Sequence, residues 1–357
     1  MKKQRTKTSI KRIKIRQKKI ERLKIKSSKK KRQRNIINNN KKVSFKERSS
    51  NNDNFFKLPK RITVYAEANL SLLENTDNVL DFIKEIESVT TNCKKIILTL
   101  DLTIVVNIDI GCISILLSKI NKLAQMNIPI ICDLPKNEEC RRMFFESGFS
   151  DHMRDLQGRK IKYSKKNNNL MVNRGFDKTS NQELGLAIKE AVNHLIGIKN
   201  PYQPVYSIAQ EMCANSVEHA NKHNKNWLFS VWYKNDDEVC FTMTDIGEGI
   251  LGTLRRKFSQ IIKELFLKNN KDILHRAFEK KYTSSTKDIN RNKGLPKIKN
   301  IADRNYINNL IVITNDVMLD FSNDAKSKIL KRKFNGTFYY WELNKNCIEI
   351  WKNRILM

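Results

Sequence analysis

The residues VCFTMTDIGEGI, from Val239 to Ile250, combine an apolar strand with a polar, glycine-containing turn. The strand is expected over Val239–Thr244, and Asp245, Gly247 and Gly249 follow it directly. Two closely spaced glycines let the backbone turn sharply and approach a planar ligand. A plain turn has the same pattern, so its meaning depends on the sequence around it.

Upstream, a helix is expected over Pro204–His219, with proline in its first turn. Glu211 and Asn215 are four residues apart and therefore share one helix face. A carboxylate beside a carboxamide suits Mg²⁺, which prefers oxygen ligands and phosphates. The alternative is an ordinary amphipathic helix whose polar side faces water.

Downstream, Gly294 opens a second expected helix, where free N–H groups can bind phosphate and Lys293 and Lys297 add positive charge. Further on, strands are expected over Leu310–Thr314 and Val317–Phe321, and Asn335-Gly336-Thr337 leads into the last expected strand, Thr337–Leu343. A simple helix start and a tight turn are the alternatives. Each feature alone is weak, but four features in this order and spacing argue against chance.

Together, the four features resemble the Bergerat-fold ATP-binding domain of the GHKL superfamily, which includes gyrase B, heat-shock chaperones, mismatch-repair ATPases, sensor histidine kinases and anti-sigma-factor kinases. The match covers about residues 180–345. The resemblance implies a two-layer α/β sandwich that binds ATP and Mg²⁺. It also implies a mobile ATP lid over Leu251–Asn292, in which Thr283–Thr286 and Arg291 could reach phosphates.

The resemblance assigns a role to each matching residue. Asn215 would ligate Mg²⁺, and Glu211 would act as the general base in hydrolysis. Asp245 would accept a hydrogen bond from the adenine amino group, and Thr337 would support adenine through water. The remaining cofactor-binding positions lie in the two glycine boxes: Gly247, Gly249, Lys293 and Gly294.

The second glycine box departs from the family pattern, because Asn292 stands where its first glycine is usual. Nucleotide turnover is therefore less firmly implied than nucleotide binding. None of the five histidines has the sequence context of a phosphoacceptor, which argues against a phosphorelay histidine kinase. The spacing of Glu211, Asn215 and His219 resembles anti-sigma-factor serine kinases and related regulatory ATPases.

The first half of the chain resembles the STAS fold of anti-sigma-factor antagonists. An apolar strand over Lys95–Asp101 is followed by Val106–Cys112 and then by a helix expected over Asp109–Met126. In that family a loop serine accepts phosphate, but Ile110 and Gly111 occupy the two serine positions here. The resemblance therefore implies a domain that senses or docks a protein partner without being phosphorylated at that loop.

The formal net charge of +32 is concentrated in one segment. Residues 1–50 hold 22 Lys and Arg against two acids, a net +20. This tail is open to three interpretations: a disordered solvated segment, a nucleic-acid contact, or a basic amphipathic helix over residues 9–26 on an anionic membrane. Heavy use of Lys, Asn and Ile can also reflect coding bias, which weakens any argument from charge.

Composition limits the class of protein. A 39% hydrophobic content argues against collagen-like, mucin-like and wholly disordered chains. The seven cysteines form no CxxC pair, which argues against a disulfide framework and a thiolate zinc site. No apolar secretion signal follows the basic start, and Ile96–Leu117 carries acids unsuited to a membrane span. We therefore expect a cytoplasmic protein.

The expected fold class is α/β (α+β), with a STAS-like mixed-sheet domain preceding a GHKL domain. The expected divisions are a basic tail (1–57), the STAS-like domain (58–152), a linker (153–180), the GHKL domain (181–345) and a C-terminal tail (346–357). The leading hypothesis is a regulatory ATPase or Ser/Thr kinase using ATP and Mg²⁺. The alternatives are a nucleotide-gated binding module without turnover and a nucleic-acid-associated ATPase that uses the tail.

Overall fold

Contacts within the chain separate Met1–Leu58 from a second compact unit, Pro59–Met357. The basic tail lies outside the described residues, and the predictions made for it stay predictions. The computed structural model describes residues 59–92, 96–149, 153–154, 159, 170–175, 181–219, 227–257, 269–279 and 294–355.

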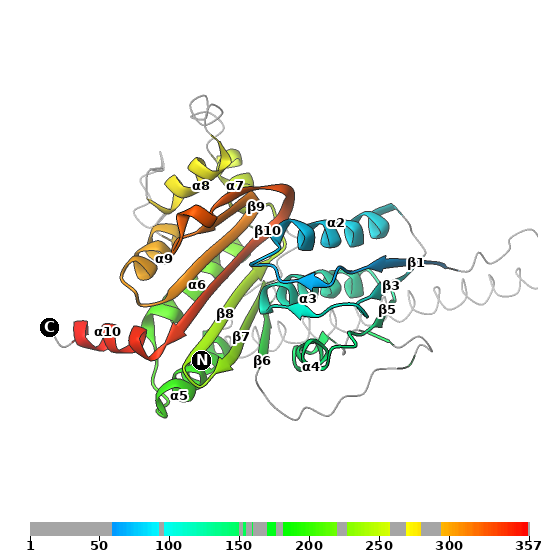
Figure 1. The fold of residues 1–357 in the computed structure, drawn as a ribbon. Helices are drawn as coiled ribbons and strands as arrows, with labels where there is room; N and C mark the ends of the chain where they lie inside the picture. The colour runs from blue at the N-terminus through cyan, green and yellow to red at the C-terminus, as the bar shows by residue number, and fades with distance from the viewer. Residues whose placement is uncertain are drawn as a thin grey trace, which may run out of the picture. The chain divides into compact units, whose positions relative to one another are not determined.

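The first half of this unit contains a three-stranded parallel sheet of order β1-β3-β5 (Figure 1). Apolar side chains alternate along β1, whereas β3 is buried along most of its length. Two short strands, β2 and β4, pair separately and also run parallel. The elements are β1 (Lys60–Tyr65), β2 (Asn69–Leu70), α2 (Thr76–Asn92), β3 (Ile96–Asp101), β4 (Asn107–Ile108), α3 (Ile110–Gln125), β5 (Ile130–Asp133) and α4 (Glu138–Glu146).

The second half contains a five-stranded sheet of order β6-β7-β8-β10-β9, in which every neighbouring pair is antiparallel. Its strands are β6 (Leu170–Gly175), β7 (Trp227–Asn235), β8 (Glu238–Asp245), β9 (Asn308–Asp320) and β10 (Lys328–Asn344). Its helices are α5 (Asn181–Ile196), α6 (Gln203–His219), α7 (Gly249–Lys257), α8 (Asn270–Phe278), α9 (Gly294–Asp303) and α10 (Lys345–Ile355), with a 3-10 turn η2 (Asp324–Lys326). The expected α/β class is therefore confirmed.

Both faces of the antiparallel sheet are covered. Helices α5, α6 and α9 lie on one side, where their apolar residues share a core with Phe229, Phe241 and Trp341 (Figure 1). The rings of Phe241 and Trp341 stack with an interplanar angle of 2°. On the other side, α2 and α3 of the first half share a core with Phe334 and Phe338. The predicted two-layer sandwich did not include this second covering layer.

Helix α3 is the central element of this second core. Residues 110–120 are all buried, which is characteristic of a helix surrounded by protein. Its first turn is capped by Asp109, whose carboxylate accepts a 2.7 Å hydrogen bond from the Cys112 amide. Further along, the hydroxyl of Ser114 lies 2.7 Å from that of Thr242 and 3.2 Å from that of Ser230. Buried hydroxyls thus fasten α3 to strands β7 and β8.

Helix α2 is fastened to the long β10 strand by charged groups. The Lys331 amide donates a 2.8 Å hydrogen bond to Asp77, and the Lys328 ammonium lies 3.6 Å from the same carboxylate. Arg332 and Asp81 form a further ion pair. Because these pairs are partly exposed, most of the stability of this contact comes from the apolar core beside it.

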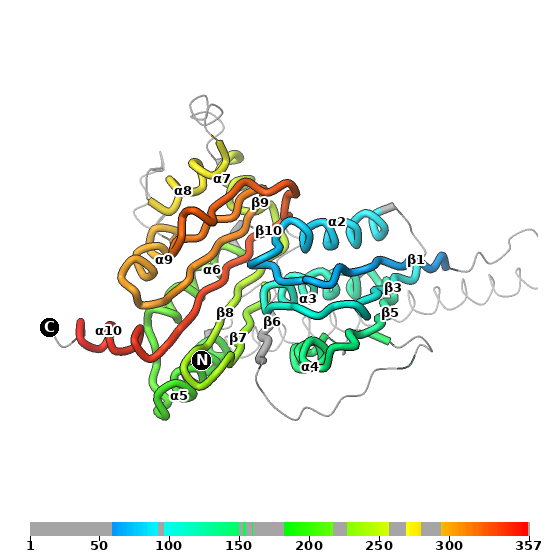
Figure 2. Tube along the Cα trace, viewed as in Figure 1, coloured from blue at the N-terminus to red at the C-terminus, as the bar shows by residue number. Residues whose placement is uncertain are grey.

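Three elements differ from their sequence-based expectations. Strand β6 lies within the segment 153–180 expected as a linker, and it extends the antiparallel sheet by pairing with β7. Helix α10 replaces the expected C-terminal tail at the end of the trace in Figure 2. It buries Cys347 and Ile348. The two strands expected at 310–314 and 317–321 are one strand, β9, in which Asn315 adopts a φ of 55°.

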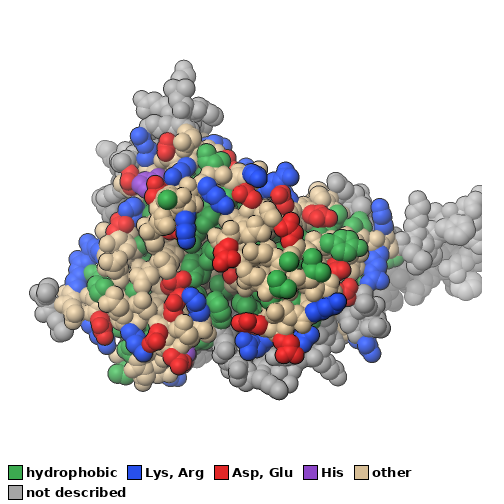
Figure 3. Space-filling model, in the orientation of Figure 1, with side chains coloured by type: hydrophobic (Ala, Val, Ile, Leu, Met, Phe, Trp, Pro, Cys, Tyr) green, Lys and Arg blue, Asp and Glu red, His purple; other side chains and the backbone are tan. Residues whose placement is uncertain are grey.

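The surface of the described unit mixes both signs of charge. Figure 3 shows Lys and Arg side chains interspersed with Asp and Glu over the face in view. This distribution agrees with the sequence count, which places most of the excess positive charge before residue 51. Among the described helices, none has the length and apolarity needed to cross a bilayer.

The hydroxyl contact of α3 gives a stability prediction. We expect Ser114→Ala to lower the free energy of unfolding by about 1–3 kcal/mol, because it deprives buried hydroxyls of Ser230 and Thr242 of a partner. Ser118→Ala is the matched control: its hydroxyl is also buried, but it has no hydrogen-bond partner among the described residues. Urea denaturation of both variants measures the effect. Equal destabilisation by the two would contradict the role given to Ser114.

Candidate functional site

The polar face of α6 meets the start of α9. Glu211 and Asn215 are both half-buried, and the first residue of α9, Gly294, packs against them. A β-carbon at Gly294 would lie 3.0 Å from Glu211 Oε2 and 3.6 Å from Asn215 Nδ2. The backbone of α9 therefore approaches α6 at a point where a side chain would crowd Glu211. Three residues predicted to share a site are brought together here.

Glu211 also has a charged partner in α9. The Lys297 ammonium donates a 3.0 Å hydrogen bond to Glu211 Oε1, and the two side chains are 43% and 31% exposed. The sequence placed Lys297 at the start of this helix as a source of charge. It gave no indication that Lys297 would pair with the candidate base, because 86 residues separate the two in the chain.

Asp245 ends β8 and is connected to α6 and β10. Its Oδ2 atom accepts a 3.1 Å hydrogen bond from the Ser216 hydroxyl, and its Oδ1 atom accepts a 3.2 Å bond from the Thr337 amide. Burial raises the pKa of Asp245 to about 6, although the hydrogen bonds from Ser216 and Thr337 oppose this shift. Since Ser216 directly follows Asn215, this contact holds Asp245 against α6 one residue away from Asn215.

The turn after Asp245 is held by β9. The Ile250 amide donates a 3.0 Å hydrogen bond to Thr314 Oγ1, and the Leu251 amide donates one of the same length to Asn315 Oδ1. Gly249 adopts a φ of +74°, and a β-carbon there would lie 2.5 Å from Asn315 Oδ1. The glycine is therefore required by both backbone conformation and space. Thr314 and Asn315 were not identified from the sequence.

The glycine before Thr337 has an equally specific role. Gly336 adopts a φ of +146°, and a β-carbon there would lie 2.1 Å from the carbonyl oxygen of Asp245. Strand β10 can approach Asp245 only because this position has no side chain. Gly247 lies in the same turn, where a β-carbon would be 3.4 Å from Asp245 Oδ1. The Asn335-Gly336-Thr337 motif thus marks a close backbone approach.

The structure places seven of the eight predicted site residues around one region between α6, α9 and the ends of β8 and β10. Lys293 lies outside the described residues, as do Asn292, Arg291 and the Thr283–Thr286 run of the expected lid. Ser216 was not among the predicted site residues, although its hydroxyl contacts Asp245. The seven placed residues are Glu211, Asn215, Asp245, Gly247, Gly249, Gly294 and Thr337.

This region offers acceptor groups for an amino group and oxygen atoms for a divalent cation. A carboxylate has about four lone-pair positions, and the described contacts of Asp245 leave acceptor capacity for an amino group. Glu211 and Asn215 offer the oxygen atoms that Mg²⁺ prefers. Gly294 leaves the first turn of α9 without a side chain beside them.

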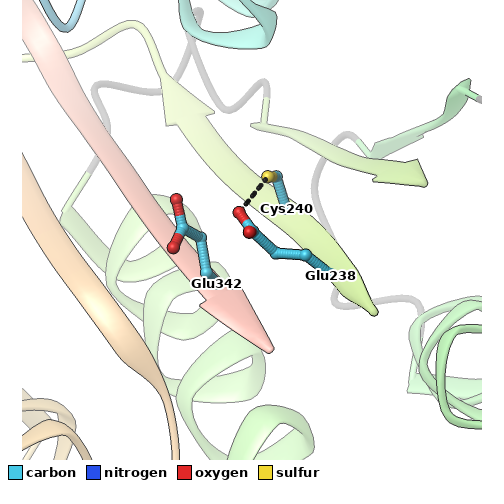
Figure 4. A group of neighbouring side chains, drawn as sticks. All are labelled: Glu238, Cys240 and Glu342. Carbon is cyan, nitrogen blue, oxygen red and sulfur yellow. Dashed lines mark hydrogen bonds between the residues drawn. The ribbon is translucent and has the colours of Figure 1, made fainter. Parts of the chain in front are cut away.

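A second polar cluster lies at the far ends of β8 and β10, where Glu238, Cys240 and Glu342 place their ligand atoms within 4.8 Å of one another (Figure 4). Each group already has a partner. The Lys234 ammonium lies 2.7 Å from Glu238, and the Tyr340 hydroxyl donates to Glu342. Burial raises the pKa of Cys240 to about 12, which keeps the thiol protonated. We therefore assign this cluster no metal.

No protein-family model matches this chain, and a search of curated proteins returns no match.

The positive-φ glycine at the start of α7 gives a second stability prediction. We expect Gly249→Ala to destabilise the protein by more than the roughly 1–2 kcal/mol of left-handed backbone strain, because the new methyl group also clashes with Thr314 and Asn315. Gly197→Ala is the control, since Gly197 has a similar φ of +71° and nothing within 4 Å of its β-carbon position. Chemical denaturation should rank Gly249→Ala as the more damaging change. The reverse order would contradict the packing described for the turn.

Asp245 predicts a dependence of stability on pH. Its folded-state pKa of about 6 lies above the ordinary value of 3.8, so the folded protein binds the proton more tightly than the unfolded chain does. This proton-linked contribution is present in full below pH 4 and is lost as pH rises through 6. The shift corresponds to about 3 kcal/mol.

Urea denaturation between pH 4 and 7 tests this linkage. Asp245→Asn has no carboxylate at this position and should not show this loss. We therefore expect the free energy of unfolding of the variant to rise relative to that of wild type as pH rises. Stability curves that run parallel over this range would contradict a raised pKa at Asp245.

Proposed function

We propose that this chain is a regulatory protein that binds ATP and Mg²⁺ through a histidine-kinase-like (GHKL, Bergerat-type) domain. The observation that carries this proposal is the contact of Ser216 with Asp245. It holds Asp245, and through the Thr337 amide strand β10, against α6 one residue after Asn215. The antiparallel sheet with α5, α6 and α9 on one face also agrees with such a domain.

The Asp245 end of the site suits adenine. A partly buried carboxylate at a strand end accepts a hydrogen bond from an exocyclic amino group and orients the base. Gly247 leaves space directly beside Asp245 Oδ1. Thr337 holds this carboxylate through its amide, so the adenine contact would be positioned before the ligand arrives.

The α6–α9 end suits phosphates. The amide groups in the first turn of α9 carry a partial positive charge, and Lys297 adds a full charge beside them. Asn215 would ligate Mg²⁺, which when bound supplies neutralisation of phosphate charge. Gly294 permits the close approach of α9 on which this arrangement depends.

The reaction favoured by these residues is phosphoryl transfer from ATP to water or to a Ser/Thr hydroxyl. The attacking oxygen would bond to the terminal phosphorus while the bond to the bridging oxygen breaks. Glu211 would take the proton of the attacking group. The ion pair with Lys297 neutralises the carboxylate that would act as base. A pair that persists with ATP bound would favour the other candidate, a nucleotide-gated binding module without turnover.

We further propose that the parallel-sheet half is a STAS-like domain that serves as the protein's own regulatory element. Its helix α3 is covered by β7, β8 and β10, and the Ser114 hydroxyl is buried within that contact. Ser114 is therefore shielded from phosphorylation. A separate protein partner would use a surface of this half other than the covered side of α3. The cytoplasmic location and the nucleic-acid contact of residues 1–50 remain proposals from the sequence.

Titration of the full-length protein with ATP in the presence and absence of Mg²⁺ tests the proposed function. We expect saturable binding that is strengthened by Mg²⁺, and we expect Asp245→Asn to weaken it at least about tenfold, which is the size of a lost charged hydrogen bond. Asp133→Asn, at the end of β5 in the other sheet, should leave binding unchanged. Equal affinity of Asp245→Asn and wild type would remove the adenine assignment.

Phosphate release from the same preparations distinguishes an enzyme from a binding module. Glu211→Ala should retain ATP binding and lose turnover by about 100-fold or more if Glu211 is the general base. Absence of turnover in wild type, together with saturable binding, would favour the nucleotide-gated module.

A further inference from the structure

Lys297 occupies a position from which it can contact two different anions. It lies in the first turn of α9, three residues after Gly294, and helical side chains extend toward the N-terminus of their helix. Its ammonium is therefore directed to the same end of α9 as the free amide groups of the first turn. In the structure this ammonium is bonded to Glu211 Oε1 at 3.0 Å.

The ion pair between Lys297 and Glu211 is weak enough for Lys297 to exchange its partner. Both side chains are partly exposed, at 43% and 31%, and ion pairs of this exposure are screened by solvent. A terminal phosphate carries more charge than a carboxylate and forms strong charge-assisted hydrogen bonds with ammonium groups. A phosphate placed at the start of α9 would therefore compete with Glu211 for Lys297.

The neighbouring lysine of the same helix provides a contrast. Lys299 bonds Asp303 at 2.6 and 2.8 Å, a pair within α9 four residues apart. It makes no described contact with α6. Lys297 and Lys299 thus share residue type, helix and type of partner, but only Lys297 bridges to a residue of the proposed site.

We infer that Lys297 is a positioning residue that holds Glu211 while the nucleotide site lacks a terminal phosphate and exchanges to that phosphate when a nucleoside triphosphate binds. This inference rests on the proposed function. Exchange releases Glu211 from its ion pair only when the third phosphate is present, so the carboxylate is neutralised with a diphosphate bound. Lys297 thereby makes the site respond to the difference between ATP and ADP.

Binding measurements with Mg·ATP and Mg·ADP test the inference without relying on turnover. We expect Lys297→Met to weaken Mg·ATP binding about tenfold, the loss of one charge-assisted hydrogen bond, and to weaken Mg·ADP binding less than about threefold. Lys297→Arg, which keeps the charge, should restore most of the ATP preference. Lys299→Met should match wild type for both nucleotides.

A double-mutant cycle tests the exchange itself. Glu211→Gln removes the competitor for Lys297, so it should strengthen Mg·ATP binding in the wild-type background and strengthen it less when Lys297 is already Met. Urea denaturation of each variant checks that folding is preserved. An equal gain in both backgrounds would reject the exchange.

The two levels of the proposal fail separately. Wild-type protein that binds neither Mg·ATP nor Mg·ADP would reject the proposed function together with this inference. Wild-type protein that binds both, with Lys297→Met reducing the two affinities equally or leaving both unchanged, would reject the inference alone.

Discussion

The burial of α3 between two sheets is the constraint on which the described unit depends. Residues 110–120 are shielded on all sides, and such a helix gains stability only when both neighbouring layers are in place. The hydroxyl of Ser114 also fixes where α3 lies along the strands, because it contacts Ser230 on β7 and Thr242 on β8. The register of α3 against the antiparallel sheet is therefore specified by polar as well as apolar contacts.

Strand β10 connects the packing of α3 with the candidate site, because it contacts both. Successive side chains of a strand point to opposite faces, so Phe338 packs with the α3 side while Tyr339 packs with the α6 side. Gly111 brings α3 close to Phe338, where a β-carbon would lie 3.0 Å from the ring. The adjacent Thr337 holds Asp245 through its amide. One strand thus joins the interior packing of the first half to the carboxylate proposed to recognise adenine.

Much of the fold was predictable because its signals are local. Sequence patterns marked the helices α3 and α6, and apolar runs marked β3 and β8. The placement of Glu211 beside Gly294 and of Asp245 beside Thr337 agrees with the order of the motifs, and the roles of these residues stay predictions. Docking of α3, the strand β6 and the bond between Lys297 and Glu211 were not predictable, because each depends on contacts between segments far apart in the sequence. Helix α10 was missed because polar residues in a short terminal segment resemble a tail.

The central position of α3 also sets an order of assembly during synthesis. The ribosome completes α3 about two hundred residues before β10, the strand that packs against Gly111. Until β7, β8 and β10 emerge, the side of α3 that bears Gly111 and Ser114 has no sheet to cover it. The first half therefore leaves the ribosome with an unfinished apolar surface, of the kind that chaperones bind and that promotes aggregation of nascent chains. Final folding waits for the last third of the chain.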